Sequence, residues 1–426
     1  MSQIHSPAAE QPQPRLVHLD ILRGFALLGI LLINMNAFVL PTITEYLNQE
    51  ASTFLHDRLT ADFLGIFVRG KFYTIFALLF GASFALMATK ANQVGNSFFS
   101  VYLRRILVLG VIGLLHSVLI WTGDILLLYS MTAILLLLFF RKTKSSRLLK
   151  WSLACYISVL IFTLIAALAG EMAKLDPIAH KELTAGLQQS MESIRSNLES
   201  IEQAYLYGNY SQVLEARMME LREVWNLYSG TMLMILGHFL LGAWLIRSDR
   251  LVKVHLYRGF YRNLLRWGLL IGLPLSYLSV ALLKGQNYLS LDLPVMLASA
   301  AQIIGHPMLA LAYIAAILLI GMRRPLFHWF APAGQMALTN YLLQSLFWTT
   351  VCYGYGLGLA TSLSSRFLQI LLACGFFILQ AVFSHWWLVH FSQGPLEWLW
   401  RSISYWQWQP LRRPQLGLKK PSMAQS

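Results

Sequence analysis

Long apolar runs, separated by short polar or charged segments, dominate the pattern along the chain. A helix needs about 20 mostly apolar residues to cross a membrane, and the chain contains ten runs of roughly that kind. Their length predicts an all-α, polytopic integral membrane protein with about ten transmembrane helices. The predicted spans are Leu19–Leu40, Asp62–Thr89, Leu103–Trp121, Asp124–Phe140, Leu149–Ala169, Tyr228–Ile246, Leu264–Leu283, Pro294–Ile320, Gln335–Tyr353 and Phe367–His390.

Basic residues are concentrated in every second interval between these runs. Membrane proteins gather Lys and Arg in short cytoplasmic loops. If the amino terminus is cytoplasmic, 22 of the 33 Lys and Arg residues fall in inner segments. The short outer segments hold little beyond Arg58, Lys284 and Arg366. The alternation therefore predicts ten spans with both termini in the cytoplasm.

One outer segment, residues 171–227, is too long for a simple turn and holds nine acidic against five basic residues. Apolar residues recur there at helical spacing and predict two amphipathic helices. The two stripes are Ile194, Leu198, Ile201 and Tyr205, then Leu214, Met218, Leu221 and Trp225. The segment is interpreted as a cap on the membrane domain, with a substrate lid or a partner surface as the alternatives.

The chain is predicted to consist of five parts, with the long outer segment in the middle. A membrane bundle of about five helices lies on each side of it, and polar tails lie at both ends. The parts are a disordered cytoplasmic terminus (1–18), the first bundle (19–170), the acidic extracytoplasmic segment (171–227), the second bundle (228–401) and a basic cytoplasmic tail (402–426).

Composition narrows the function classes. The chain of 426 residues is 57% hydrophobic and 12% charged, which excludes a soluble enzyme. The net charge is +14, and most of the Lys and Arg residues lie at the predicted inner membrane face. Nucleic-acid binding is therefore not expected, and the bilayer is the main partner. Cys155, Cys352 and Cys374 lie in separate apolar runs without metal-binding spacing, and neither a metal nor a permanently bound cofactor is expected.

Ionisable groups inside membrane spans are costly, so each is a candidate functional residue. Asn34 lies about 16 Å beyond the cytoplasmic end of the first span, and His116 lies at a similar depth in the third. Asp124 begins the fourth span after the short turn Trp121–Gly123, and Lys71 approaches the same level. We therefore expect these four residues to face one outward cavity.

The four side chains suit acyl transfer to a hydroxyl or amine. His116 would act as the base and Asp124 would orient it, while Asn34 or Lys71 would stabilise the oxyanion. The structural alternatives are a histidine that only bonds a neighbour and a carboxylate that only caps a helix.

At the inner side, Asp20, Arg23, Arg104 and Arg105 lie near the predicted membrane surface, where the arginines could bind the phosphates of a donor. For Asp20 and Arg23 the alternative is a helix-end pair with a snorkelling arginine. Asn340 and Gln344 lie four residues apart on one helix face. They are candidates for substrate binding, with hydrogen bonding between helices as the alternative.

Five motifs resemble the YeiB-like family of bacterial inner-membrane proteins, a family of unknown function. They run in the family's order from about Leu16 to Arg401. The motifs are His18–Gly24 continuing to Asn34, Gly70–Phe72 continuing to Phe76–Gly81, His116 with Trp121–Leu126, Met336–Ser345, and Gln393–Arg401. The resemblance implies a multi-pass protein of the bacterial inner membrane.

The opening Leu-Asp-x-x-Arg-Gly pattern, at Leu19–Gly24, is also similar to integral-membrane acyltransferases, including heparan glucosaminide N-acetyltransferases. This second resemblance covers mainly the first span, and Asn34 stands where the glucosaminide enzymes also have asparagine. It implies an acyltransferase that uses acyl-CoA as a co-substrate.

Two main hypotheses follow. The first is an acyltransferase that moves an acyl group from a cytoplasmic donor such as acyl-CoA to an extracytoplasmic acceptor such as a glycan. The second is a transporter or exporter of a small molecule, because intramembrane polar groups also mark substrate paths. A non-catalytic envelope scaffold is the third possibility. Oligomeric state is not predicted by the sequence.

Overall fold

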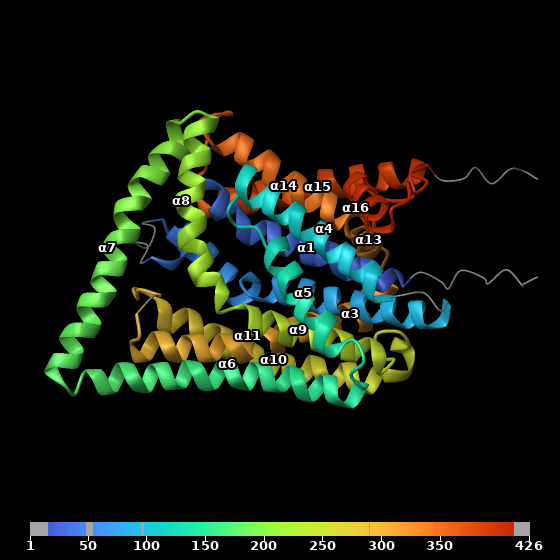
Figure 1. The fold of residues 1–426 in the computed structure, drawn as a ribbon, viewed down its shortest axis with the longest axis horizontal. Helices are drawn as coiled ribbons and strands as arrows, with labels where there is room; N and C mark the ends of the chain where they lie inside the picture. The colour runs from blue at the N-terminus through green and yellow to red at the C-terminus, as the bar shows by residue number, and fades with distance from the viewer. Residues whose placement is uncertain (1–15, 48–53, 95–97, 289, 413–426) are drawn as a thin grey trace, which may run out of the picture.

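The computed structural model describes residues 16–47, 54–94, 98–288 and 290–412 and folds them almost entirely into helices (Figure 1). Within these ranges, extended pairing is limited to one isolated bridge, between Phe391 and Arg412. The prediction of an all-α fold is thus confirmed. The main helices are α1 (Val17–Val39), α2 (Leu55–Phe63), α3 (Lys71–Val94), α4 (Phe98–Leu119), α5 (Leu126–Phe140), α6 (Ser145–Ala173), α7 (Pro177–Tyr207), α8 (Tyr210–Ser229), α9 (Met232–Arg247), α10 (Arg258–Leu283), α11 (Leu293–Leu319), α12 (Pro325–His328), α13 (Phe330–Gln335), α14 (Ala337–Cys352), α15 (Arg366–His390) and α16 (Pro395–Tyr405).

Each of the ten predicted apolar runs overlaps at least one of these helices. In the described part of the chain, seven helical segments are long and apolar enough to cross a membrane, as judged by length and composition. They include α1, α4, α6, α10, α11, α15 and the segment Leu55–Thr89. Helices α5, α9 and α14 are shorter, with 15, 16 and 16 residues. The structure thus supports a membrane-type helical protein.

Successive helices run back and forth between two ends of one bundle (Figure 1). We call the end covered by α7 and α8 the cap end, and the opposite end, at α16, the base. At the base, His18 Nε2 lies 2.7 Å from the Leu251 carbonyl oxygen, and Trp400 Nε1 donates to the Arg105 carbonyl at 2.8 Å. At the cap end, the Gly354 amide donates to the Tyr205 carbonyl at 2.8 Å.

The second apolar run is interrupted, although the hydrophobic pattern predicts one continuous helix over Asp62–Thr89. Helix α2 passes into a π-helical turn at Leu64–Val68, and the chain then breaks at Gly70, whose φ is +82°. Glycine adopts this left-handed conformation without the steric cost that a side chain imposes. The break places Lys71 at the first position of α3, inside the bundle.

Helices from the two halves of the chain pack together by close backbone contact. A methyl group on Gly81 of α3 would lie 1.9 Å from the Phe239 carbonyl oxygen of α9. A methyl group on Gly242 of α9 would lie 1.8 Å from the Leu78 carbonyl oxygen of α3. Small residues of this kind allow membrane helices to approach closely. Helices α3 and α9, which belong to the predicted parts 19–170 and 228–401, therefore pack directly against each other.

The segment predicted as an acidic cap forms α7 and α8, which cross one end of the bundle (Figure 1). The predicted stripe on α7 faces inward, with Ile194, Ile201 and Tyr205 buried. The predicted stripe on α8 is wrong, because Met218 and Trp225 are exposed. Its buried face instead comprises Val213, Ala216, Arg217, Glu220 and Val224. Two ionisable residues, Arg217 and Glu220, lie on this buried face, so the apolar pattern alone indicates the wrong side of the helix.

Of the predicted tails, residues 1–15 and 413–426 lie outside the described residues.

Candidate functional site

The structure brings His116 and Asp124 together as a buried pair. His116 Nδ1 lies 2.7 Å from Asp124 Oδ2, and each side chain is only 1% exposed. The second carboxylate oxygen, Oδ1, accepts a hydrogen bond from the Leu127 amide at 2.8 Å. Asp124 therefore caps the start of α5 with one oxygen and orients the imidazole with the other. Both alternatives weighed for these residues describe part of the geometry, and neither accounts for the whole of it.

A glycine on α4 lets this pair form. A methyl group at Gly113 would lie 2.4 Å from the Leu127 amide nitrogen and 2.9 Å from Asp124 Oδ1. Only a residue without a side chain leaves room for the start of α5 against this face of α4. One turn further along α4, His116 projects toward the same carboxylate. The short turn after α4 closes with the Trp121 amide donating to the His116 carbonyl at 2.9 Å.

The second ring nitrogen of His116, Nε2, is buried and has no hydrogen-bond partner among the described residues. An ionised carboxylate only accepts, so a bond to Asp124 places the proton of a neutral imidazole on Nδ1 and leaves a lone pair on Nε2. The rings of Tyr341 and Trp121 lie 5.4 and 6.3 Å from the imidazole, centroid to centroid. The pair thus has the arrangement of a general base and its orienting carboxylate.

Asn34 lies on α1, and no hydrogen bond among the described residues joins it to this pair. The Trp121 indole packs on Phe38 at 4.5 Å between ring centroids and donates to the Ala37 carbonyl at 3.0 Å. Asn34 is half-buried on α1, four residues before Phe38, and residues four apart lie about 6 Å apart on one helix face. Asn34 therefore lies about one helical turn closer to the base than Phe38, the α1 residue that contacts Trp121.

Glu220 of α8 links the cap to the same turn, although no motif in the sequence distinguishes it. Its carboxylate accepts from the Thr122 hydroxyl at 2.7 Å, the Tyr205 hydroxyl at 2.6 Å and the Ile43 amide at 3.2 Å. Burial raises the pKa of Glu220, and these hydrogen bonds partly oppose the rise. Thr122 lies between His116 and Asp124 in the chain, so the cap holds the turn that carries the pair.

Arg217, one turn before Glu220, is also fully buried, and its Nη1 donates to the Val118 carbonyl at 3.0 Å. Its other guanidinium nitrogens, Nε and Nη2, have no partner among the described residues. From the sequence alone, Arg217 and Glu220 resemble the exposed charges around them. Only contact with α4 and with the Thr122 turn distinguishes them.

Lys71 belongs to a different cluster, beside the break in the second apolar run. Its Nζ donates to the Gly65 carbonyl at 2.9 Å, and the residue is fully buried. The His306 ring lies beside Gly70, where a methyl group would be 1.9 Å from His306 Nδ1. Thr74, one turn after Lys71, has its hydroxyl 3.1 Å from His238 Nε2. The described contacts do not join Lys71 to His116 and Asp124.

The predicted donor-binding residues lie near the base, where Asp20, Arg23 and Arg105 also make structural contacts. Arg23 Nη1 donates to Asp20 Oδ1 at 2.8 Å, and Arg23 Nη2 donates to the Ser83 hydroxyl at 2.7 Å. The Arg105 guanidinium lies 4.0 Å from the centroid of the Trp400 ring. Arg104 Nε is buried without a partner among the described residues. The structure thus places all four at one end, although in separate contacts.

Asn340 and Gln344 join α14 to α15. Asn340 Nδ2 donates to the Ser384 hydroxyl at 2.9 Å, and Gln344 Nε2 donates to Gln380 Oε1 at 2.8 Å. Gln380 Nε2 in turn donates to the Asn340 carbonyl at 3.0 Å. The geometry favours the alternative interpretation, hydrogen bonding between helices.

Glu397 connects the last two motifs. Its Oε1 accepts from the amides of Leu338 and Thr339 at 2.7 and 3.1 Å, and its Oε2 accepts from the Thr339 hydroxyl at 2.6 Å. A carboxylate at the start of α14 is favoured by the helix dipole and by the unpaired amides there. Burial raises the pKa of Glu397, and hydrogen bonds from Thr339 partly oppose the rise.

The described residues contain no cluster of three or more His, Cys, Asp or Glu side chains with the geometry to hold a metal ion.

Comparisons with known proteins give relatives over almost the full chain. YxaH of Bacillus subtilis is 31% identical over 415 residues, covering 93% of this chain and 95% of the relative. YeiB of Escherichia coli is 31% identical over 399 residues, covering 92% and 96%. A protein from the amylase 3′ region of Bacillus acidopullulyticus is 26% identical over 396 residues. The relatives named YxaH and YeiB are described as uncharacterized.

The family described as protein of unknown function (DUF418) matches residues 245–407, from the end of α9 through α16. No solved structure matches the chain. The identity and the coverage together confirm the resemblance drawn from the five motifs. The chain belongs to the YeiB-like family of bacterial proteins, a family of unknown function.

Proposed function

We propose that the protein is an integral-membrane acyltransferase. The observation that carries the proposal is the buried His116–Asp124 pair, with Nδ1 bonded to the carboxylate at 2.7 Å and Nε2 left without a protein partner. Ionisable side chains are costly to bury inside a membrane protein, so a buried His–Asp pair is a candidate functional site. General-base catalysis is the use for which this geometry is suited.

In the proposed reaction, His116 Nε2 removes the proton from an acceptor hydroxyl or amine. The oxygen or nitrogen then attacks the carbonyl carbon of an acyl thioester, with Asn34 as the candidate for stabilising the oxyanion. The carbon–sulfur bond breaks, and the CoA thiolate takes the proton from the imidazolium. The products are the acylated acceptor and free CoA. The Asp124 carboxylate holds the imidazole in one orientation.

The proposal includes the topology predicted from charge. Ten spans, formed by the seven long segments together with α5, α9 and α14, would place the base in the bacterial cytoplasm and α7–α8 outside the inner membrane. The side-chain pair then lies toward the cap end, near an extracytoplasmic acceptor such as a glycan. The acyl-CoA donor would approach from the base, on the side of Arg23, Arg104 and Arg105.

The test is transfer of label from labelled acetyl-CoA by purified protein in native lipid extract, with CoA release measured in parallel. We expect His116→Gln and Asp124→Asn each to reduce turnover about 100-fold or more, the usual contribution of a positioned base. His238→Gln is the matched control, because His238 is also fully buried but bonds to Thr74 rather than to a carboxylate.

Folding of each variant would be checked by thermal unfolding. Full turnover by a folded His116→Gln variant would refute the proposed base. Absence of turnover by the wild type across several acyl donors would refute acyl transfer itself.

The second candidate, a transporter, is favoured by the break at Leu64–Gly70. Interrupted membrane helices commonly form substrate sites in transporters, and buried Lys71 lies at this break. A transporter moves labelled substrate unchanged into sealed vesicles, whereas an acyltransferase makes a covalent product. Flux without product formation would favour this candidate.

A further inference from the structure

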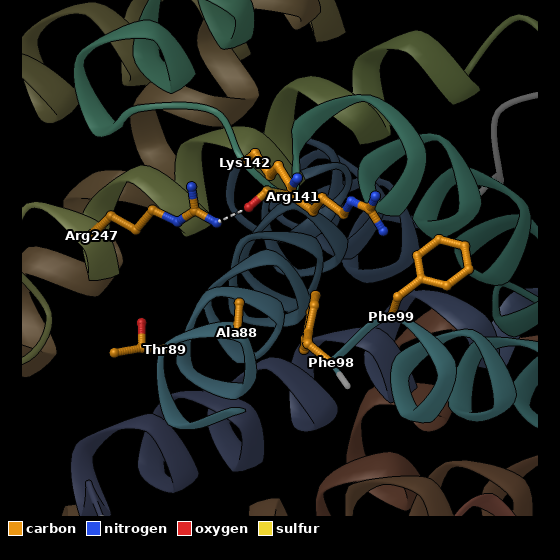
Figure 2. A pocket seen from close by; sticks show the side chains of 7 residues that line it. All are labelled: Ala88, Thr89, Phe98, Phe99, Arg141, Lys142 and Arg247. Atoms are coloured by element: carbon orange, nitrogen blue, oxygen red, sulfur yellow. Dashed lines mark hydrogen bonds between the residues drawn. The ribbon is translucent and has the colours of Figure 1, made fainter. Parts of the chain in front are cut away.

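A second polar site lies at the base, away from the His116–Asp124 pair. A pocket of about 580 Å³ opens where the ends of α3, α4, α5 and α9 meet (Figure 2). Small-molecule sites usually measure about 300–1,000 Å³. The lining combines three cations with an apolar part and comprises Ala88, Thr89, Phe98, Phe99, Arg141, Lys142 and Arg247.

The residues that line this pocket include three cations and no acidic residue. The chain contains no Asp or Glu between Asp62 and Asp124, and none between Asp124 and Glu171. These stretches supply all of the lining except Arg247. Asp249 follows Arg247 by two residues, but its carboxylate forms a salt bridge with Lys253 at 2.6 Å. Three cations around one pocket therefore repel one another unless an anion joins them.

Two of the cations are held in place by uncharged partners. The Arg247 guanidinium donates to the carbonyls of Thr143 and Arg141, the latter at 2.9 Å (Figure 2). The Arg141 guanidinium lies over the Phe99 ring, 4.8 Å from its centroid. Carbonyls and an aromatic ring fix the position of a guanidinium while leaving its charge uncompensated. The bonds from Arg247 also cap the end of α5. This structural role explains the position of Arg247 but not the presence of the Arg141 and Lys142 side chains at the pocket.

We propose that this pocket binds a phosphate group. Arg141, Lys142 and Arg247 would supply charge-assisted hydrogen bonds, for which arginine is especially suited. Phe98 and Phe99 would contact the apolar or aromatic part attached to the phosphate. The same chemistry fits the headgroup of an anionic phospholipid or a soluble phosphorylated molecule. The proposal does not depend on acyl transfer.

The experiment compares full-length wild type with the double variant Arg141→Gln/Lys142→Gln. The matched control is Arg147→Gln/Lys150→Gln, which removes the same charge from exposed residues of α6 at the same end. In the first arm, each protein is placed in mixed phosphatidylcholine–phosphatidylglycerol nanodiscs, and native mass spectrometry counts the retained phosphatidylglycerol. In the second arm, equilibrium dialysis measures binding of labelled pyrophosphate in phosphatidylcholine nanodiscs.

We expect the pocket variant to bind at least about tenfold more weakly than the control, because each lost contact is charge-assisted. Selective loss of phosphatidylglycerol would identify a lipid headgroup as the source of the phosphate. Selective loss of pyrophosphate binding would identify a soluble ligand. Equal binding by the pocket variant and the control, or no binding by wild type in either arm, would overturn the proposal.

Discussion

Replacing Glu220 by alanine tests how the cap is attached to the membrane bundle. This carboxylate receives hydrogen bonds from Thr122, Tyr205 and Ile43, which lie on the turn after α4, on α7 and after α1. Alanine removes the common acceptor and leaves these donors buried. We therefore expect α8 to separate from the bundle more readily, with the change confined mainly to the cap end.

The magnitude follows from counting the donors that lose a partner. The Thr122 hydroxyl can turn to Thr42 Oγ1, 3.1 Å away, so it keeps a partner. The Tyr205 hydroxyl and the Ile43 amide belong to residues that are 3% and 1% exposed and have little access to water. An unsatisfied buried donor costs about 1–3 kcal/mol. Two of them reduce the free energy of opening α8 by about 2–6 kcal/mol.

Glutamine should cost less than alanine. Its amide oxygen can still accept from one side, and its amide group can donate to the Thr122 and Tyr205 hydroxyl oxygens, which also accept. About one donor then loses its partner, and the expected cost is about 1–3 kcal/mol. The order wild type, Glu220→Gln, Glu220→Ala is therefore the specific prediction.

Hydrogen exchange of the α8 amides measures this opening directly. A loss of about 2 kcal/mol makes exchange about 30-fold faster, since 1.4 kcal/mol corresponds to a factor of ten. Glu215→Ala is the control, because Glu215 lies on the same helix and is exposed. Exchange of α8 in Glu220→Ala within about threefold of the Glu215→Ala rate would refute the reasoning.

Three other predictions concern packing, helix capping and pH. Gly242→Ala places a methyl group 1.8 Å from the Leu78 carbonyl oxygen, so we expect destabilisation of at least about 1–3 kcal/mol and a lower melting temperature than Gly375→Ala, whose added methyl meets nothing within 4 Å. Glu397→Ala leaves two buried amides at the start of α14 without their acceptor, and we expect faster hydrogen exchange there than in Glu397→Gln. Burial raises the pKa of Glu220 above its ordinary 4.5, so the folded cap binds more protons than the opened one. Cap stability should then fall as pH rises from about 4.5 through the raised pKa, by up to about 1.4 kcal/mol per pH unit, and Glu220→Gln should flatten this slope in urea unfolding followed at several pH values.

The sequence predicts the helices well because their apolar runs must be long. The break at Gly70 escapes this reasoning, since Leu64–Val68 stays apolar while its hydrogen bonding changes from α to π. The stripe on α8 fails for a related reason. A pattern search assigns charged residues to water, whereas Arg217 and Glu220 are buried against partners from α4, α7 and the turn after α1. Tertiary hydrogen bonds of this kind are not encoded in local spacing.

The candidate site is likewise predicted only in part from the sequence. His116 and Asp124 can be paired from the sequence, because only a short turn separates them. Lys71 lies instead beside Gly65 and His306, since the break in the helix redirects the start of α3. Depth along a span can be estimated from a rise of about 1.5 Å per residue. The direction in which a side chain points depends on the rotation and continuity of the helix.

The turn that carries Asp124 is bonded both to the bundle and to the cap. Asp124 is held from the bundle side by the Leu127 amide, while Thr122, two residues earlier, is held from the cap side by Glu220. Opening α8 therefore releases the restraint from the cap and leaves those from the bundle, among them the Leu127 amide and the Trp121 indole bond to Ala37. If His116 is the base, Glu220→Ala should lower turnover through loss of orientation while His116 stays bonded to Asp124. A cap that only shields the bundle would leave turnover unchanged, so the same variant separates a positioning role from a covering one.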